Sequence, residues 1–361
     1  MSSKTKKLFS VMAALGVVLS ITGCARGGGT QPVSTAPQSD SSGSAVAAAP
    51  DAPASVYTIK VGHVVDEENS LHKGFVIFKE YVEKESGGRL AVEIYPNALL
   101  GGDRELVEGV ELGTFQMTAP ASTVLVTYAA DMGILDMPFL FSDAQAGFRA
   151  LDGALGEKLD KIIREKVGVM NLGYGYNGAR AVSNNVRPIK QPSDLNGIKI
   201  RVMESPIYID TFKALGANPT PMSFGEVFTA LQQGTVDGQD NAATLTVSSR
   251  FSEVQKYYTN LGHTQSFMPM LINVDFFEGL PAELQTIVRD GVKVGLVDAQ
   301  RSIEIEDRDT AIQAMIDSGT TQVDEVTPEN YSKFVAAVQS VYEKNKSTID
   351  PALFDLAQSF N

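Results

Sequence analysis

Residues 197–202, Gly-Ile-Lys-Ile-Arg-Val, have the pattern of a short strand. The stretch begins with Gly197, and Arg201 lies near its C-terminal end. A helical pattern follows at 206–215. Outward from this unit, apolar periodicity predicts strands at 56–62, 90–95, 116–119 and 167–173, and helices at 70–86, 103–112 and 224–233. Strands that alternate with helices predict an α/β fold with mostly parallel sheets, whose ligand sites lie at the carboxyl ends of the strands.

A long helical pattern near the C-terminus suggests how the chain is organised. It starts at Pro281 and continues to about Ser318 without another proline. At 1.5 Å per residue such a helix spans about 55 Å, more than one small domain. We therefore expect two lobes with this helix spanning both, as the length of residues 55–361 also favours. The alternative is two shorter helices broken at Gly295, because glycine weakens a helix interior.

The N-terminal segment predicts the compartment. Lys4, Lys6 and Lys7 precede a mostly apolar stretch at 8–19, and Cys24 follows small residues. The apolar stretch is too short to cross a bilayer, so residues 1–23 are predicted to be a lipoprotein signal peptide. Cys24 is the only cysteine in the chain and cannot form an internal disulfide, so we expect it to carry a lipid anchor. The alternative is an incidental cysteine in a cleaved signal.

The composition after Cys24 indicates a tethered acidic protein. Residues 24–54 are rich in Gly, Ser, Ala and Pro and have no apolar period, so they are predicted to be a flexible tether. The formal net charge of the chain is −13, and the leader holds lysines but no acids. Such a surface argues against nucleic-acid partners and against adhesion to anionic lipid. We expect a globular protein held at the outer face of the cytoplasmic membrane.

Two arginines and an amide form a candidate anion site. Arg180 ends the segment Asn-Gly-Ala-Arg at 177–180, Arg201 lies near the end of the strand at 197–202, and Asn241 ends Val-Asp-Gly-Gln-Asp-Asn at 236–241. Guanidinium groups are permanently charged and match a carboxylate bidentately. Alternatives stay open for each: Arg201 in an ion pair with one of the acids, Arg180 pinning a crossover between lobes, and Asn241 in a turn.

Three further residues are weaker candidates for ligand contact. Phe224 opens a helix and could be a ligand platform or a core residue, and Asp103 could bind a ligand hydroxyl or cap its helix. His63 follows the first strand and could face the ligand or the core. His72 and His263 have no metal-ligand spacing with it, so we expect no zinc site and no cofactor.

Five segments together resemble a known family. They are residues 99–105, 177–180, 197–202, 219–227 and 236–241. Their order and spacing are similar to those of the solute-binding subunits of tripartite ATP-independent periplasmic (TRAP) transporters, the DctP group. The resemblance covers about residues 56–345. Asp240 stands where the family more often has glutamate, and Gly225 where a serine or another small residue is common.

The resemblance implies a two-lobed clamshell that binds an organic acid and delivers it to a membrane permease. It implies that Arg201 forms a salt bridge with the substrate carboxylate, with Arg180, Asn241 and Phe224 as further contacts. We place lobe I at 55–178 plus about 267–305, and lobe II at about 179–266 plus 306–361. The protein is expected to be a monomer and not an enzyme.

The substrate and the downstream partner stay open. The segments at 201–206 and 216–222 resemble the sugar-acid branch, so uronates or related hydroxy acids are favoured over succinate-like dicarboxylates. A receptor that presents ligand to a sensor kinase would have the same binding site. A secreted hydrolase is disfavoured because the chain lacks Gly-x-Ser-x-Gly, His-Glu-x-x-His and common phosphate-loop motifs.

Overall fold

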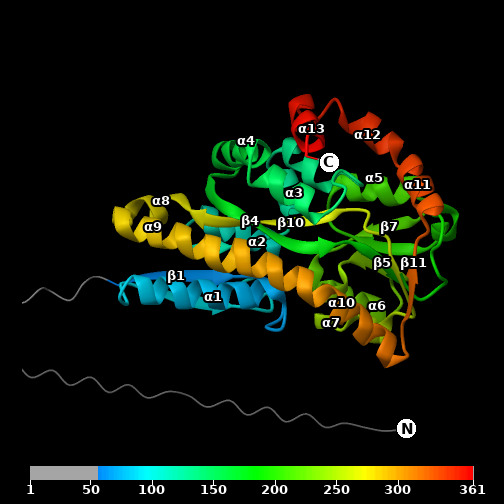
Figure 1. The fold of residues 1–361 in the computed structure, drawn as a ribbon, viewed down its shortest axis with the longest axis horizontal. Coiled ribbons are helices and arrows are strands. Elements are labelled where there is room, and N and C mark those ends of the chain that lie inside the picture. The colour runs from blue at the N-terminus through cyan, green and yellow to red at the C-terminus, as the bar shows by residue number, and fades with distance from the viewer. Residues whose placement is uncertain (1–55, 361) are drawn as a thin grey trace, which may run out of the picture. The chain divides into compact units, whose positions relative to one another are not determined.

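The computed structural model describes residues 56–360, which form two β-sheets with helices around them (Figure 1). We name the part with the first sheet lobe I and the part with the second sheet lobe II. The first sheet has the order β2-β1-β3-β10-β4, with β1 Tyr57–Gly62, β2 Leu90–Tyr95, β3 Met117–Thr118, β4 Val169–Ala179 and β10 Gln265–Asn273. The second has the order β11-β9-β5-β8-β6-β7, with β5 Ala181–Asn184, β6 Lys199–Val202, β7 Asn218–Pro221, β8 Gly238–Asn241, β9 Tyr257–Asn260 and β11 Gln322–Glu325.

Both sheets are mixed, which corrects the expectation of mostly parallel sheets. Five strand pairs of the described chain are parallel and four are antiparallel. The antiparallel pairs involve β10 and β5. The reason is the path of the chain: β4 continues into β5 through Arg180, and β9 leads into β10, so the chain passes directly between the sheets without a crossover helix.

The helices and strands predicted between residues 56 and 233 are present near their expected bounds, except that β4 extends six residues beyond the strand expected at 167–173. The helices are α1 Ser70–Glu85, α2 Asp103–Glu111, α5 Pro206–Ala214 and α6 Val227–Gln232, the last preceded by a 3₁₀ turn at Phe224–Glu226. Helix α1 begins where the Asn69 side chain accepts a hydrogen bond from the Leu71 amide at 2.9 Å, and its apolar positions Phe75, Phe78 and Val82 are buried. Periodicity therefore identified the buried face of α1 correctly.

Further short elements lie in both lobes and at the C-terminus. They are the 3₁₀ helices η1 Ser122–Thr127 and η2 Ala130–Asp136, then α3 Ala144–Leu151, α4 Ala154–Ile162, α7 Ala243–Ser248, α8 Val274–Gly279, α11 Pro328–Ala337, α12 Gln339–Asn345 and α13 Pro351–Gln358. Within residues 56–360, no helix has both the length and the apolar composition needed to cross a membrane. The predictions for residues 1–54, including the signal peptide, Cys24 and the tether, lie outside the described residues.

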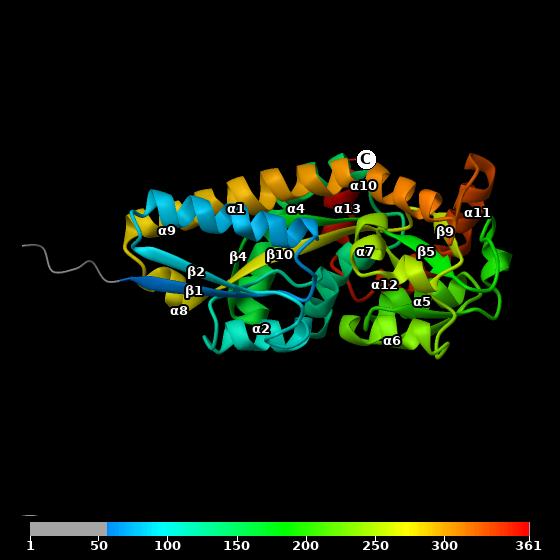
Figure 2. The ribbon, with the colours of Figure 1, turned by 90° about the horizontal axis from the view of Figure 1, so that it is seen from below.

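The long C-terminal helix is present, and the alternative of a break at Gly295 is wrong. Helix α9 Ala282–Gly291 continues through a π-helical segment, η7 Val292–Ala299, into α10 Gln300–Ser318. This run passes along α1 of lobe I and continues past α7 of lobe II (Figure 2). One continuous element therefore contacts both lobes.

Gly295 of the long helix packs directly against Gly74 of α1. A Cβ atom on Gly295 would lie 2.7 Å from the Gly74 carbonyl oxygen and 2.6 Å from the Phe78 amide nitrogen of α1. A Cβ on Gly74 would in turn lie 2.8 Å from the Gly295 carbonyl oxygen. The two backbones touch here, so glycine is required by helix packing rather than by helix geometry.

Gly295→Ala is expected to destabilise the protein by about 1–3 kcal/mol, because the added methyl group overpacks a backbone contact. An alanine at an open helical position instead stabilises by up to about 1 kcal/mol. Gly279→Ala is the matched control, because a Cβ there meets no atom within 4 Å. Urea unfolding measures both variants, and an equal or higher stability of G295A would contradict the close packing.

Candidate functional site

A cavity of about 270 Å³ lies between residues of the two lobes. Five of the six predicted ligand residues line it: Arg201, Arg180, Asn241, Phe224 and Asp103. The other lining residues are Val64, Val65, Leu71, Gly102, Arg104, Glu105, Ala119, Ala121, Thr123, Val124, Thr127, Asn177, Met203, Glu204, Met222, Ser223, Leu245 and Met268. A small concave space with a few charged groups among apolar residues is typical of a small-molecule site.

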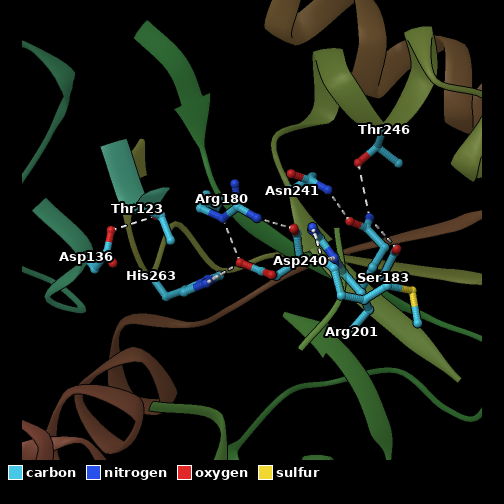
Figure 3. Close-up of polar contacts among 11 residues, drawn as sticks. Thr123, Asp136, Arg180, Ser183, Arg201, Asp240, Asn241, Thr246 and His263 are labelled. Atoms are coloured by element: carbon cyan, nitrogen blue, oxygen red, sulfur yellow. Dashed lines mark hydrogen bonds and ion pairs between the residues drawn. The ribbon is translucent and has the colours of Figure 1, made fainter. Parts of the chain in front are cut away.

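Arg201 is a buried cation without an anionic partner. Its side chain is 3% exposed, and its Nε and Nη2 donate to the carbonyl oxygen of Met222 at 3.0 and 2.7 Å (Figure 3). Among residues 56–360, no carboxylate lies within ion-pairing distance of this guanidinium, so the ion-pair alternative is wrong. Burial lowers the pKa of Arg201 to about 10, although the charges of Asp240, Asp103 and Glu204 oppose this fall.

Arg180, in contrast, already has a carboxylate. Its Nε donates to Asp240 Oδ2 at 2.6 Å, its Nη2 donates to the Asp240 carbonyl oxygen, and His263 Nε2 lies 3.3 Å from the same carboxylate oxygen (Figure 3). Burial opposes ionisation of Asp240, yet Arg180 holds its pKa below the usual range. Arg180 stands at the corner between β4 and β5, so this buried pair joins the crossover to β8.

Asn241 contributes a polar amide to the cavity wall, and Phe224 contributes an apolar ring. The Asn241 side chain is buried at the end of β8, and its Nδ2 donates to Gln239 Oε1 at 2.5 Å. Gln239 is held in turn by a 2.9 Å bond to Ser183. The Phe224 ring is half-buried, and its centroid lies 5.7 Å from that of Phe251, so the ring packs on one side and faces the cavity on the other.

Asp103 contributes a carboxyl group from lobe I. It is the first residue of α2, but Gly102 occupies the capping position and no side chain caps the helix, so the capping alternative is wrong. Its carboxylate accepts a hydrogen bond from the Ala121 backbone. Although Asp103 keeps partial exposure, desolvation by the surrounding protein raises its pKa to about 7.

His63 lies in the core and is not a lining residue of the cavity. Its Nε2 is 3.1 Å from Nδ1 of His72, and its ring stacks on Phe75 with centroids 5.7 Å apart. Burial lowers the pKa of His63 to about 3, so the ring is neutral. This position agrees with the inward-facing alternative.

Several residues of the site were not singled out by the sequence. Asn177 lines the cavity from the end of β4 and stands in the segment 177–180, so a signal existed. Thr123 lines the cavity and donates to Asp136 Oδ1 at 2.8 Å. Asp136 is buried and accepts the Thr123 bond in Figure 3, and its other oxygen accepts from Ser205, just beyond the Arg201 strand, at 2.7 Å. No sequence pattern marked this bridge between the lobes.

The stability of the unliganded protein is expected to fall as the pH rises from 5 to 8. Burial raises the pKa of Asp103 and Glu304 to about 7 and that of Asp136 to about 6. A raised pKa stabilises the folded state below the unfolded value, and this contribution is lost as pH rises through the folded value. The urea midpoint at pH 5 and pH 8 measures this effect, and Asp136→Asn should reduce the fall. A midpoint that rises with pH would contradict the assignment.

Comparison with known proteins agrees with this geometry. The profile of the DctP family, bacterial extracellular solute-binding protein family 7, matches residues 61–348. A solute-binding protein of Verminephrobacter eiseniae is 38% identical over 282 residues, 78% of this chain and 84% of the relative. A TRAP periplasmic solute-binding protein of Shewanella oneidensis, solved with succinate, has a TM-score of 0.82 and 31% identity, covering 85% of this chain and all of that one. The sugar-acid-binding protein DctPAm of Advenella mimigardefordensis, in complex with galactonate, has a TM-score of 0.82 and 29% identity, covering 85% and 99%.

Proposed function

This chain belongs to the DctP family of TRAP solute-binding proteins, and we propose that it captures a sugar acid outside the cytoplasm for delivery to a TRAP permease. Proteins of this family bind organic acids for transport, and we propose no catalytic role for this one. The observation that carries the proposal is Arg201, a buried guanidinium at the cavity wall without an ion pair among the described residues. A ligand carboxylate supplies the missing charge through hydrogen bonds worth about 1.5–3 kcal/mol each.

The distribution of charge favours a ligand with one carboxylate and several hydroxyl groups. Arg180 is neutralised by Asp240, so Arg201 is the cation that remains for the ligand at this end of the cavity. The lobe I wall carries Asp103 and Glu105. Carboxyl groups accept hydrogen bonds from hydroxyls, whereas they repel a second ligand carboxylate. Galactonate in the Advenella relative has this chemistry.

A C4-dicarboxylate is the second candidate. Arg104 also lines the cavity from lobe I and provides a cation for a second carboxylate. The Shewanella relative was solved with succinate. Arg104 is exposed, however, so its charge is more strongly screened than that of Arg201.

A thermal-shift screen tests the proposal. D-glucuronate, D-galacturonate and D-galactonate are expected to raise the melting temperature, because a ligand at 100 times its dissociation constant stabilises by about 2.7 kcal/mol. Succinate and malate serve as comparison ligands. A shift with malate and none with the sugar acids would reverse our order of substrates. Sustained turnover of any of these acids would instead favour an enzyme.

We further propose that Cys24 carries the lipid that holds the protein at the outer face of the cytoplasmic membrane, with residues 25–54 as a tether, and that the protein acts as a monomer. The support is the basic, apolar and small-residue order of residues 4–24. Cys24→Ser should release the protein from the membrane fraction, measured by fractionation of cells. Retention of the variant would exclude anchoring through this residue.

A further inference from the structure

Glu304 is a buried carboxyl group that contacts both lobes. It lies on α10 and is 2% exposed. Its Oε2 accepts a hydrogen bond from Ser70 Oγ at 2.6 Å, and its Oε1 accepts one from Thr244 Oγ1. Ser70 is the first residue of α1 in lobe I, whereas Thr244 belongs to α7 in lobe II. One side chain on the long helix therefore holds an element of each lobe.

The two hydroxyl groups are close to the ligand cavity along the chain. Leu71 follows Ser70 and Leu245 follows Thr244, and both leucines line the cavity. Glu304 itself is not a lining residue. Its carboxyl group thus lies behind the cavity wall, where it contacts the elements that form the wall rather than the ligand.

The passage of the chain between the lobes also touches Glu304. Gly178, near the end of β4, has a φ of +80°, and a Cβ there would lie 2.7 Å from Glu304 Oε1. One turn earlier on the helix, Gln300 Nε2 donates to Ser70 Oγ at 3.0 Å and to the Tyr176 carbonyl oxygen at 2.6 Å. The crossover, the start of α1 and the start of α7 therefore meet at one side of α10.

We propose that Glu304 is a positioning residue that sets how far the two lobes close, because its carboxyl group holds Ser70 of lobe I and Thr244 of lobe II together. A rotation of one lobe against the other about an axis away from Glu304 lengthens at least one of these two hydrogen bonds. The inference rests on the proposed function in that closure serves ligand capture.

The surroundings of Glu304 make the contact between the lobes dependent on pH, because they set the pKa of its carboxyl group. Burial raises the pKa of Glu304 to about 7, although the two hydroxyl donors oppose this rise. Lys73 and Asp307 face it, and they form an ion pair with each other at 3.3 Å. Tyr176 and Tyr258 also interact with it and stay neutral because burial raises their pKa values, and α7 has no titratable side chain. Burial, not the two hydrogen bonds, is what opposes ionisation, so an ionised Glu304 favours a conformation in which water reaches its carboxylate. The observed arrangement is therefore favoured while Glu304 is protonated and becomes less favoured as the pH rises through about 7.

Distance measurements between the lobes test the proposal without any ligand. Leu112 in lobe I is 79% exposed and Val186 in lobe II is 46% exposed, so both positions accept a spin label as cysteine. Cys24→Ser removes the only native cysteine of the full chain. We expect the interlabel distance to lengthen or broaden between pH 5 and pH 8, with a midpoint near 7. Glu304→Gln in the Asp136→Asn background, where neither buried carboxyl group that contacts both lobes can ionise, should keep the pH 5 distribution at every pH.

Removing either hydroxyl donor gives a second, independent readout. A hydrogen bond to a charged group lowers its pKa by about one unit or more, so Ser70→Ala and Thr244→Val should each move the midpoint to higher pH by about one unit. Asp136→Asn is the matched control, because it removes another buried carboxyl group that contacts both lobes but leaves Glu304 in place. This control should retain a transition near pH 7.

The outcomes separate this inference from the proposed function. If the E304Q/D136N distribution changes with pH as the wild type does, Glu304 does not control closure. If E304Q/D136N does not fold, unchanged midpoints in S70A and T244V lead to the same conclusion. D-glucuronate affinity, measured by calorimetry on the same variants, concerns the function separately: an absence of binding by the wild type overturns the choice of ligand, whereas the interlabel distances still decide the role of Glu304.

Discussion

Arg201→Met is expected to weaken sugar-acid binding at least 100-fold and to leave the unliganded protein as stable as the wild type or more stable. The first effect follows because the ligand carboxylate loses a buried charged partner, a loss worth about 2–5 kcal/mol. The second follows because burial disfavours the Arg201 charge more than the charges of the nearby carboxylates favour it, so its removal relieves a desolvation cost. Calorimetry with D-glucuronate and urea unfolding measure the two effects on the same variant.

Arg201→Lys separates charge from shape at this position. Lysine keeps the charge but loses the planar fork, so affinity should fall at least tenfold, about 1.4 kcal/mol. Arg308→Met, at an exposed arginine on α10 paired with Asp309, is the control for a general loss of positive charge. Unchanged affinity in both R201M and R201K would remove Arg201 from the site.

Arg180→Met should have the opposite pattern, with a loss of about 3–5 kcal/mol in the free energy of unfolding. The variant leaves the Asp240 carboxylate buried, and His263 at 3.3 Å is then its remaining ionisable neighbour among the paired groups of the described chain. Urea unfolding at pH 7 measures the loss. Arg201→Met serves as the matched control, because it removes the same side chain from the same cavity.

A second substitution distinguishes the charge from the packing. The double variant R180M/D240N removes both charges and should regain part of the stability lost in R180M, because no unpaired carboxylate is left behind. If R180M is as stable as the wild type yet binds ligand weakly, then Arg180 contributes mainly to ligand binding and its ion pair with Asp240 contributes little to stability.

The long helix shows how far sequence patterns can be taken. The absence of proline between residues 281 and 318 predicted a continuous helix, and the structure has one. The pattern also allowed a break at Gly295, because the low helix propensity of glycine can be read directly from the sequence. The gain from close packing against Gly74 is not local, since the two residues are more than 200 positions apart.

Strand β10 is the clearest element that the sequence did not indicate. All nine of its residues are buried, so it lacks the alternation of a half-exposed strand, and Pro269 interrupts the pattern. Its antiparallel position between β3 and β4 depends on where the chain re-enters the first sheet. The mixed sheets therefore could not be inferred from the alternation of strands and helices.

The sequence by itself indicated the helices α1, α2 and α5, the strands β1, β2 and β6, and five of the residues that line the cavity, because these depend on periodicity and side-chain chemistry. Only the tertiary structure decided what each residue does there. Arg180 and Arg201 are chemically identical, but folding brings Asp240 to the first and only a carbonyl group to the second. Those partners come from 60 and 21 positions away, and no local pattern encodes which charge is left for a ligand.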